Sequence, residues 1–345
     1  MTITRLMSAG AETRSVKELT SALLVVGVYS RGGDYSFRAR FAYTESCRQQ
    51  ISTFLATRQI RGGFAVLRVD SEAGSDYTIF TIQDSSNNAL VQLMVDVSES
   101  ELVLKVAGSE EDRTTGDGWP GTLQVWDHIG FDVYIHSSAG WVEIEKNGVS
   151  ILSFSGNTGN VDIDETLYGT LNAPSGGGFH EHNYDDIYVD DTTGEGSASS
   201  PPMYKFEWIY PDGTGNYDDW VGSDSNNTDN YALVDERPPS EVDYVEEDTI
   251  DQFDSYTMTT YTLGAGEEIT AVIPMVYAQR YGVAEDIALG TRYTGTNVIG
   301  SVQDPGSGAY TYAQERQTTK PGGGAWDQAS LTGVEVVIYS TGTFS

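Results

Sequence analysis

Pairs of carboxylates recur in this chain at a spacing of two residues, which places both acids on one face of a β-strand. Glu143 and Glu145 form one pair, and Asp162 and Asp164 form another. Retaining glycoside hydrolysis uses two carboxyl groups about 5 Å apart. Because Glu145 leads directly into the turn Lys146-Asn147-Gly148, both glutamates are expected at the solvated edge of a hairpin. No third carboxylate completes a catalytic pattern, so no catalytic residue is predicted.

A second group of acids flanks the apolar segment 187–189. Asp185, Asp186 and Asp190 are the metal ligands that this spacing favours, with Ca²⁺ as the candidate ion. Calcium takes roughly six to eight oxygen ligands and suits acidic loops, although the EF-hand order is absent. Looser acidic loops at 212–219 and 224–229 have a similar composition. The competing interpretation is a solvated acidic surface that keeps the protein soluble.

Two histidines, His180 and His182, have the spacing of a zinc pair on one strand face. No third ligand is evident, so a surface loop is the competing interpretation. Cys47 is the only cysteine, which excludes an intramolecular disulfide and a zinc site built from several thiolates. No Gly-x-Ser-x-Gly motif occurs, so nucleophilic catalysis has no support.

Aromatic residues supply the last candidate chemistry, because their faces stack on sugar rings. Trp141 and Tyr184 are the predicted glycan-binding residues, and Trp119, Trp126 and Tyr188 are also available. The alternative is that these rings fill the core, as most Trp and Tyr do in a β-sandwich.

The charge of the chain limits its partners. The sequence has 19 Lys and Arg against 51 Asp and Glu, a net charge of −32. Such a chain repels phosphate backbones and anionic lipid surfaces, so neither nucleic acid nor membrane is an expected partner. The N-terminus lacks the apolar core of a signal peptide, so we expect synthesis in the cytoplasm without export by a signal of its own.

The elements that must carry these residues are predicted to be strands. Apolar residues alternate from Trp126 to Phe154 on both sides of Asn147-Gly148, which predicts an antiparallel meander closed by a type I′ turn. The 345 residues suffice for two domains. We predict an all-β protein with a jelly-roll sandwich over 1–191, a Gly/Ser/Pro-rich linker over 192–202 and a smaller β-sandwich over 203–345 that anchors or oligomerises the chain. In the second domain, strands are predicted at 204–208 and 269–280, and an acidic loop from 212 to 254.

Several motifs, in order, resemble one protein family. The first half carries RLMSAGAET, GDYSFRAR, WVEIEKNGVSILSFSGNT and HNYDDIYVDDTTGEGSASSPP, and the second half carries EWIYPDGTGNYDDW, NYALVDERPPSEVDYVE and TTKPGGGAWDQASLTGVEV. Together they resemble virion proteins of tailed bacteriophages that join a concanavalin A-like (LamG-like) jelly roll to a second β-domain.

The resemblance implies a non-enzymatic structural protein of the virion, which decorates the capsid or forms part of a head or tail fibre. Its expected partners are the major capsid or tail proteins and further copies of itself, as a homotrimer. The alternatives are a lectin-like module that binds host surface glycans and, third, a polysaccharide depolymerase.

Overall fold

The computed structural model describes most of the chain in full, and some strands by their backbone alone. The fully described residues are 57–69, 76–115, 119, 124–169, 182–196, 201–236, 239–280 and 286–342, and the backbone is also described at 4–9, 24–26, 36–42, 48–50, 179–181 and 285. The chain divides into two compact units, Met1–Phe206 and Glu207–Ser345. The first unit therefore extends beyond the stretch 192–202 that the sequence indicates as a linker. Cys47 and the side chain of His180 lie outside the described residues.

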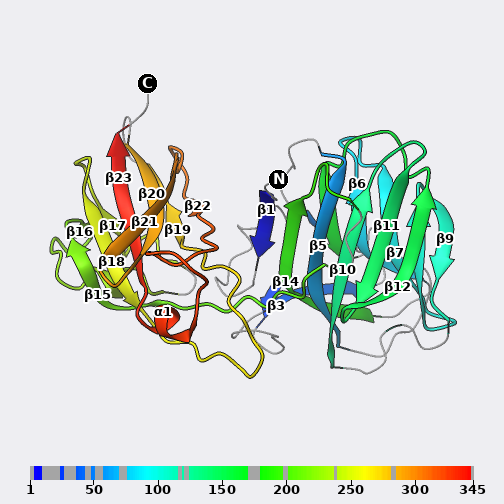
Figure 1. Ribbon diagram of the computed structural model, residues 1–345, viewed down its shortest axis with the longest axis horizontal. Helices are drawn as coiled ribbons and strands as arrows, with labels where there is room; N and C mark the ends of the chain where they lie inside the picture. The colour runs from blue at the N-terminus through cyan, green and yellow to red at the C-terminus, as the bar shows by residue number, and fades with distance from the viewer. Residues whose placement is uncertain are drawn as a thin grey trace. The chain divides into compact units, whose positions relative to one another are not determined.

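Two antiparallel sheets form the first unit (Figure 1). The larger sheet has eight described strands in the order β12 (Val149–Gly156), β11 (Gly140–Lys146), β10 (Trp126–Tyr134), β5 (Gln59–Arg68), β14 (Phe179–Asp191), β3 (Ser36–Ala42) and β2 (Leu24–Val26), with β1 (Thr4–Ala9) paired to β14. The second sheet has the order β4 (Arg48–Gln50), β13 (Glu165–Gly169), β6 (Tyr77–Gln83), β7 (Ala89–Asp96), β8 (Glu101–Val106) and β9 (Ser109–Arg113). In Figure 1, β5, β10, β11 and β12 form one layer, and β6, β7 and β9 lie behind it. The predicted jelly-roll sandwich is confirmed.

The core of this unit lies between the two layers. Phe80 of one sheet stacks on Phe131 of the other with ring centroids 4.7 Å apart, and Phe64 meets the edge of Tyr168 at 5.1 Å. All four rings are fully buried. Burial of large aromatic side chains is the main favourable term in a sandwich of this size.

The predicted meander is confirmed as β10, β11 and β12. Val133 pairs with Val142, and Val142 pairs with Phe154, so successive strands place apolar residues on the same face. Asn147 and Gly148 have φ angles of 53° and 77°, which are the positive values that a type I′ turn requires. The Asn147 side chain also accepts a hydrogen bond from the backbone N–H of His128 at 2.8 Å, which fixes the turn against β10.

The second unit is also all-β, as predicted. A five-stranded sheet has the order β15 (Pro211–Asp218), β18 (Phe253–Met258), β23 (Glu335–Gly342), β20 (Glu285–Tyr293) and β21 (Thr296–Gln303). Two ribbons join it, β16 (Val221–Gly222) with β17 (Val245–Glu246), and β19 (Met275–Ala278) with β22 (Thr311–Gln314). Its core contains Trp326, Leu289 and Ile338, against which Val276 of β19 packs.

Helical structure is sparse in the described residues. A 3₁₀ helix, η3, spans Asn230–Leu233, and one short α-helix, α1, spans Gln328–Thr332. Asp327 caps α1, because its carboxylate accepts the N–H of Ser330 at 2.8 Å. In the described part of the chain, no helix combines the length and the hydropathy needed to cross a bilayer.

Three predictions for the second half were wrong. The stretch 204–208 forms no strand, only 275–278 of the predicted strand 269–280 is a strand, and β15 takes up residues 212–218 of the predicted acidic loop. The alternating aromatic residues after the prolines serve a different purpose. Tyr204 packs on Tyr188 with centroids 4.7 Å apart, so the start of this stretch is held by the face of a sheet instead of by strand pairing.

The segment 201–206 belongs to the first unit through several specific contacts. The Tyr188 hydroxyl donates to the carbonyl of Pro202 at 2.6 Å, and the Phe206 N–H donates to Asp186 at 2.7 Å. A Cβ atom on Gly130 would come within 3.2 Å of the Pro201 ring, so the absence of a side chain there lets the segment lie close to the sheet. Part of the outer face of the large sheet is therefore covered by the chain itself.

Candidate glycan-binding site

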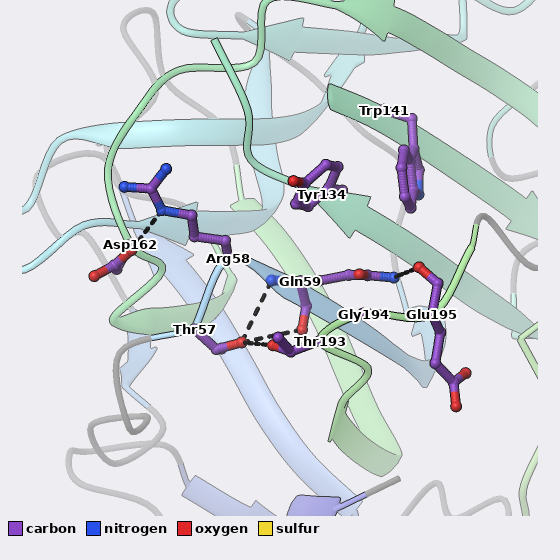
Figure 2. A pocket seen from close by; sticks show the side chains of 9 residues that line it. All are labelled: Thr57, Arg58, Gln59, Tyr134, Trp141, Asp162, Thr193, Gly194 and Glu195. Atoms are coloured by element: carbon purple, nitrogen blue, oxygen red, sulfur yellow. Dashed lines mark hydrogen bonds and ion pairs between the residues drawn. The ribbon is translucent and has the colours of Figure 1, made fainter. Parts of the chain in front are cut away.

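An open pocket of about 490 Å³ lies on the outer side of the large sheet in the first unit. Figure 2 shows its lining, with the two aromatic rings on one side, two threonines on the other and a glutamine between them. The lining residues are Thr57, Arg58, Gln59, Tyr134, Trp141, Asp162, Thr193, Gly194 and Glu195. They come from the start of β5, the end of β10, the start of β11, the loop before β13 and the segment after β14.

An aromatic platform forms one side of this pocket. Tyr134 and Trp141 are cross-strand partners in β10 and β11, and their ring centroids are 4.7 Å apart. Both side chains are partly exposed. Val133 and Val142 point into the core. Because side chains alternate along a strand, the adjacent Tyr134 and Trp141 both point to the outer face of the sheet. The His136 ring also stacks on Tyr134, with centroids 5.5 Å apart, and limits the movement of the tyrosine.

Behind the platform, a buried carboxylate holds the tryptophan in place. The Trp141 indole N–H donates to Asp132 at 3.3 Å, and the Arg61 guanidinium approaches the other oxygen of Asp132 at 3.3 Å. Asp132 is completely buried. Arg61 also lies 3.7 Å from Glu195, so this arginine pairs with the buried carboxylate of Asp132 and with the carboxylate of Glu195, which lines the pocket. A buried charge requires such a partner, because desolvation otherwise costs several kcal/mol.

The rest of the lining is polar and internally hydrogen-bonded. Arg58 donates to Asp162 at 2.8 Å and to Asn160 at 2.9 Å. Gln59 donates its side-chain amide to the carbonyl of Glu195 at 3.0 Å. The hydroxyls of Thr57 and Thr193 lie 2.8 Å apart. The lining therefore presents hydroxyl, amide and carbonyl groups, and both of its carboxylates already face an arginine.

The carboxylate pair Glu143 and Glu145 lies outside this pocket. Glu143 accepts a hydrogen bond from the Ser150 hydroxyl. Glu145 is 5% exposed, so the expectation that this side chain is solvated was wrong. Asp162 lines the pocket, but its predicted companion Asp164 does not. Neither pair gives two carboxyl groups facing one cavity.

The three predicted metal ligands are not brought together. Asp185 accepts the N–H of Asp186 at 2.9 Å, Asp186 accepts the N–H of Phe206, and Asp190 lies beside Arg61 in the register of β14 and β5. Within the described residues, no group of three or more His, Cys, Asp or Glu side chains is arranged to hold a metal ion. Residues 212–219 and 224–229 of the second unit are among the described residues, so these acidic loops also form no such group.

Most of the predicted aromatic and histidine candidates lie in the interior. Tyr184 is fully buried and donates its hydroxyl to the carbonyl of Ile79 at 3.1 Å, so its assignment as a glycan-binding residue was wrong. Trp119 is 2% exposed and Tyr188 is fully buried. His182 is also fully buried, with its ring nitrogen 3.1 Å from the Tyr77 hydroxyl, which rules out a surface zinc pair. Among the predicted aromatic candidates, Trp141 is the one that lines the pocket.

Sequence reasoning missed Tyr134, Arg61 and Glu195. The signal for Tyr134 was present, because the register of the predicted meander places it opposite Trp141. No local signal marks Arg61 or Glu195, which meet only when β5 pairs with β10 and the segment after β14 returns over the sheet.

Comparison with known proteins gives similarity of fold. No protein-family model matches the sequence, and no curated protein matches it. Among solved structures, the chain is similar to a cellulose-induced protein, Cip1, with 10% identity and a TM-score of 0.43, covering 54% of this chain and 97% of that one. It is also similar to the catalytic domain of a family 131 glycoside hydrolase from Coprinopsis cinerea, with 14% identity and a TM-score of 0.35 over 53% and 83%.

A third similar structure is the binding domain of botulinum neurotoxin DC in complex with rat synaptotagmin II. There the identity is 12% and the TM-score 0.38, and the match covers 54% of this chain and 48% of that one. Similarities of this size concern the β-sandwich and say nothing about ligands.

Proposed function

We propose that the first unit is a non-enzymatic carbohydrate-binding module and that the Tyr134–Trp141 pocket holds the sugar. The observation that carries this proposal is a partly exposed aromatic pair beside hydrogen-bonding groups, with Trp141 fixed from behind by Asp132. A ring that is already immobilised loses little conformational entropy when a ligand stacks on it. A tryptophan that only filled the core would be buried, whereas Trp141 is partly exposed and lines an open polar pocket.

The lining favours an uncharged sugar. The two carboxylates of the lining, Asp162 and Glu195, are each paired with an arginine, and the only lining arginine is Arg58. An acidic sugar would have to compete with Asp162 for Arg58 and would enter the field of a strongly acidic protein. A neutral hexose needs only the hydroxyl, amide and carbonyl partners that the pocket supplies.

The same pairing supports a binding role over a hydrolytic one. Glycosidases of both stereochemical classes use two carboxyl groups that flank the scissile bond. Asp162 lies 2.8 Å from the Arg58 guanidinium, and Glu195 lies 3.7 Å from that of Arg61. Both lining carboxylates are thus engaged by arginines, which favours the binding role over the depolymerase alternative.

An array of neutral and uronate-containing glycans tests the proposal. We expect saturable binding to neutral oligosaccharides, reduced about 30-fold by Trp141→Ala, since truncation of a central aromatic anchor costs about 2 kcal/mol. Trp126→Ala is the matched control, because Trp126 lies on β10 but outside the pocket. Absence of binding across the array, or equal loss in both variants, would refute it.

We further propose, on the sequence resemblance alone, that this module acts on the virion of a tailed phage. There it would decorate a capsid or a fibre, as a homotrimer attached to capsid or tail proteins, and would contact host glycans. Electron microscopy of virions with and without the protein tests the placement, and unchanged density would contradict it. Light scattering of the purified protein tests the trimer, and a monomer mass would contradict that part.

A further inference from the structure

The turn that joins β10 to β11 is organised by a histidine side chain. The Nδ1 atom of His136 accepts the backbone N–H of Ser138 at 3.1 Å and that of Ala139 at 2.9 Å. This turn connects the two rings of the pocket, because Tyr134 and Trp141 are the last cross-strand pair before it. The geometry of the turn therefore sets how the two rings face each other.

These two hydrogen bonds assign the protonation state of the imidazole. A ring nitrogen that accepts N–H groups carries no proton, so the His136 ring is neutral, with its proton on Nε2. The backbone of this residue is also fixed. Its N–H donates to the Thr158 hydroxyl at 2.8 Å, and its carbonyl accepts the Thr158 N–H at 3.0 Å. The ring can therefore change partners only by rotating about its own side-chain bonds.

The same imidazole packs on the aromatic platform. It stacks on the Tyr134 ring with an interplanar angle of 27°. Within the described residues, the contacts of the ring are Tyr134 and the groups of the turn, of which only the phenol is titratable, and a phenol stays neutral between about pH 5 and 7. The charged side chains that line the pocket or lie behind it are paired with opposite charges: Arg58 with Asp162, and Arg61 with Asp132 and Glu195.

We propose that His136, in its neutral form, is a positioning residue of the sugar site, which therefore releases its glycan on acidification. This inference rests on the proposed sugar-binding function. Histidine is the side chain that gains its charge between roughly pH 8 and 5. In the charged ring both nitrogens are donors, so an Nδ1–H would face the two N–H groups of the turn. The ring then has to rotate away, which removes the stack on Tyr134 and frees the turn that spaces the two rings.

Calorimetry of the full chain tests this with the neutral oligosaccharide that binds most strongly on the glycan array. We expect the wild-type affinity to be about tenfold lower at pH 5 than at pH 7. His136→Asn is the decisive variant, because an asparagine oxygen can accept the Ser138 N–H, as in an Asx turn, but does not titrate. This variant loses the stacked ring, so it should bind more weakly than the wild type at pH 7 and show no further loss at pH 5.

Asp254→Asn is the control for the pH change itself. Burial raises the pKa of Asp254 to about 6, so this carboxylate of the second unit titrates in the same range. Its substitution should leave the pH dependence of sugar binding as it is in the wild type. Equal wild-type affinity at the two pH values, or an equal loss on acidification in His136→Asn, would overturn the proposal.

A measurement without sugar separates this inference from the proposed function. The ¹⁵N spectrum of the His136 ring should show an unprotonated Nδ1 at pH 7. On acidification, the amide signals of Ser138 and Ala139 and the indole signal of Trp141 should move together with the protonation of the ring, and in His136→Asn they should stay in place. A proton on Nδ1 at pH 7, or signals that ignore the titration of the ring, would contradict the proposal. If no glycan binds at either pH, the sugar site is refuted, and this spectrum still decides whether His136 positions the rings.

Discussion

The pair formed by Arg61 and Asp132 gives the sharpest prediction about the first unit. Asp132 is fully buried, and its neighbours include the guanidinium of Arg61 and the indole of Trp141, each at 3.3 Å. Arg61→Gln removes one positive partner and leaves the carboxylate inside the protein. Breaking a buried pair in this way costs about 3–5 kcal/mol.

The size of the effect on melting follows from the size of the unit. For a unit of about 200 residues, 1 kcal/mol corresponds to roughly 2–4 °C in Tm. Arg61→Gln should therefore lower the Tm of the first unit by roughly 6–20 °C. Asp132→Asn leaves an amide oxygen as acceptor for Trp141 and removes the charge that Arg61 compensates, so the double variant should be more stable than the sum of the two single losses predicts.

A double-mutant cycle by urea denaturation measures this coupling directly. We expect an interaction free energy of about 1–3 kcal/mol between the two positions. Arg58→Gln is the matched control, because Arg58 and Asp162 form an exposed pair, with side chains 41% and 48% accessible, that contributes little. A coupling below about 0.5 kcal/mol, which is the usual error of additivity, would show that Arg61 does not hold Asp132.

Three further predictions concern local geometry and pH. Gly140→Ala should destabilise the first unit by about 1–3 kcal/mol in urea denaturation, because the new Cβ would clash with the Thr158 hydroxyl. Gly196→Ala is the control and should be neutral, because a Cβ there meets nothing within 4 Å. Equal effects of the two substitutions would contradict this prediction. Burial raises the pKa of Asp254 to about 6, so the folded state keeps a proton that the unfolded chain releases from about pH 4. Stability relative to Asp254→Asn should fall by about 3 kcal/mol between pH 4 and 7, and a flat difference would be evidence against it. The Lys320 ammonium and two hydrogen bonds from Ser330 lower the pKa of Asp327 to about 2. The loss of stability in Asp327→Ala should therefore be seen at neutral pH and should disappear as the pH falls from about 4 to 2. Thermal melts measure this difference, and a loss that stays constant with pH would contradict the prediction.

The meander could be predicted because its determinants are local. Period-two apolar residues and the Asn147-Gly148 turn specify both the strands and their register. The same register places Trp141 on the outer face. In contrast, β15 was missed because its sequence, PDGTGNYD, shows no apolar alternation, and its pairing with β18 is interrupted by register shifts.

A bulge in β14 explains why the site residues of that strand were misplaced. The pairing of β14 with β5 shifts register between Asp185 and Tyr188, and Asp186 has a φ of 51°. A bulge moves the residues after it to the opposite face, so Tyr184 enters the core while Tyr188 meets Tyr204 on the outer side. The bulge also gives Asp185 and Asp186 different partners and separates them from Asp190. Nothing in the local sequence indicates this irregularity.

The central claim is that a sugar stacks on Trp141, and the indole N–H resonance of this residue tests it most directly. The sequence has six tryptophans, and Trp141→Phe identifies the relevant signal in a ¹H–¹⁵N spectrum. Because the Trp141 ring lines the pocket and its indole N–H donates to Asp132, its resonance should shift progressively and saturably on titration with a neutral oligosaccharide that binds the protein. The Trp126 signal should stay in place. Saturable binding that leaves the Trp141 signal unmoved would contradict the account.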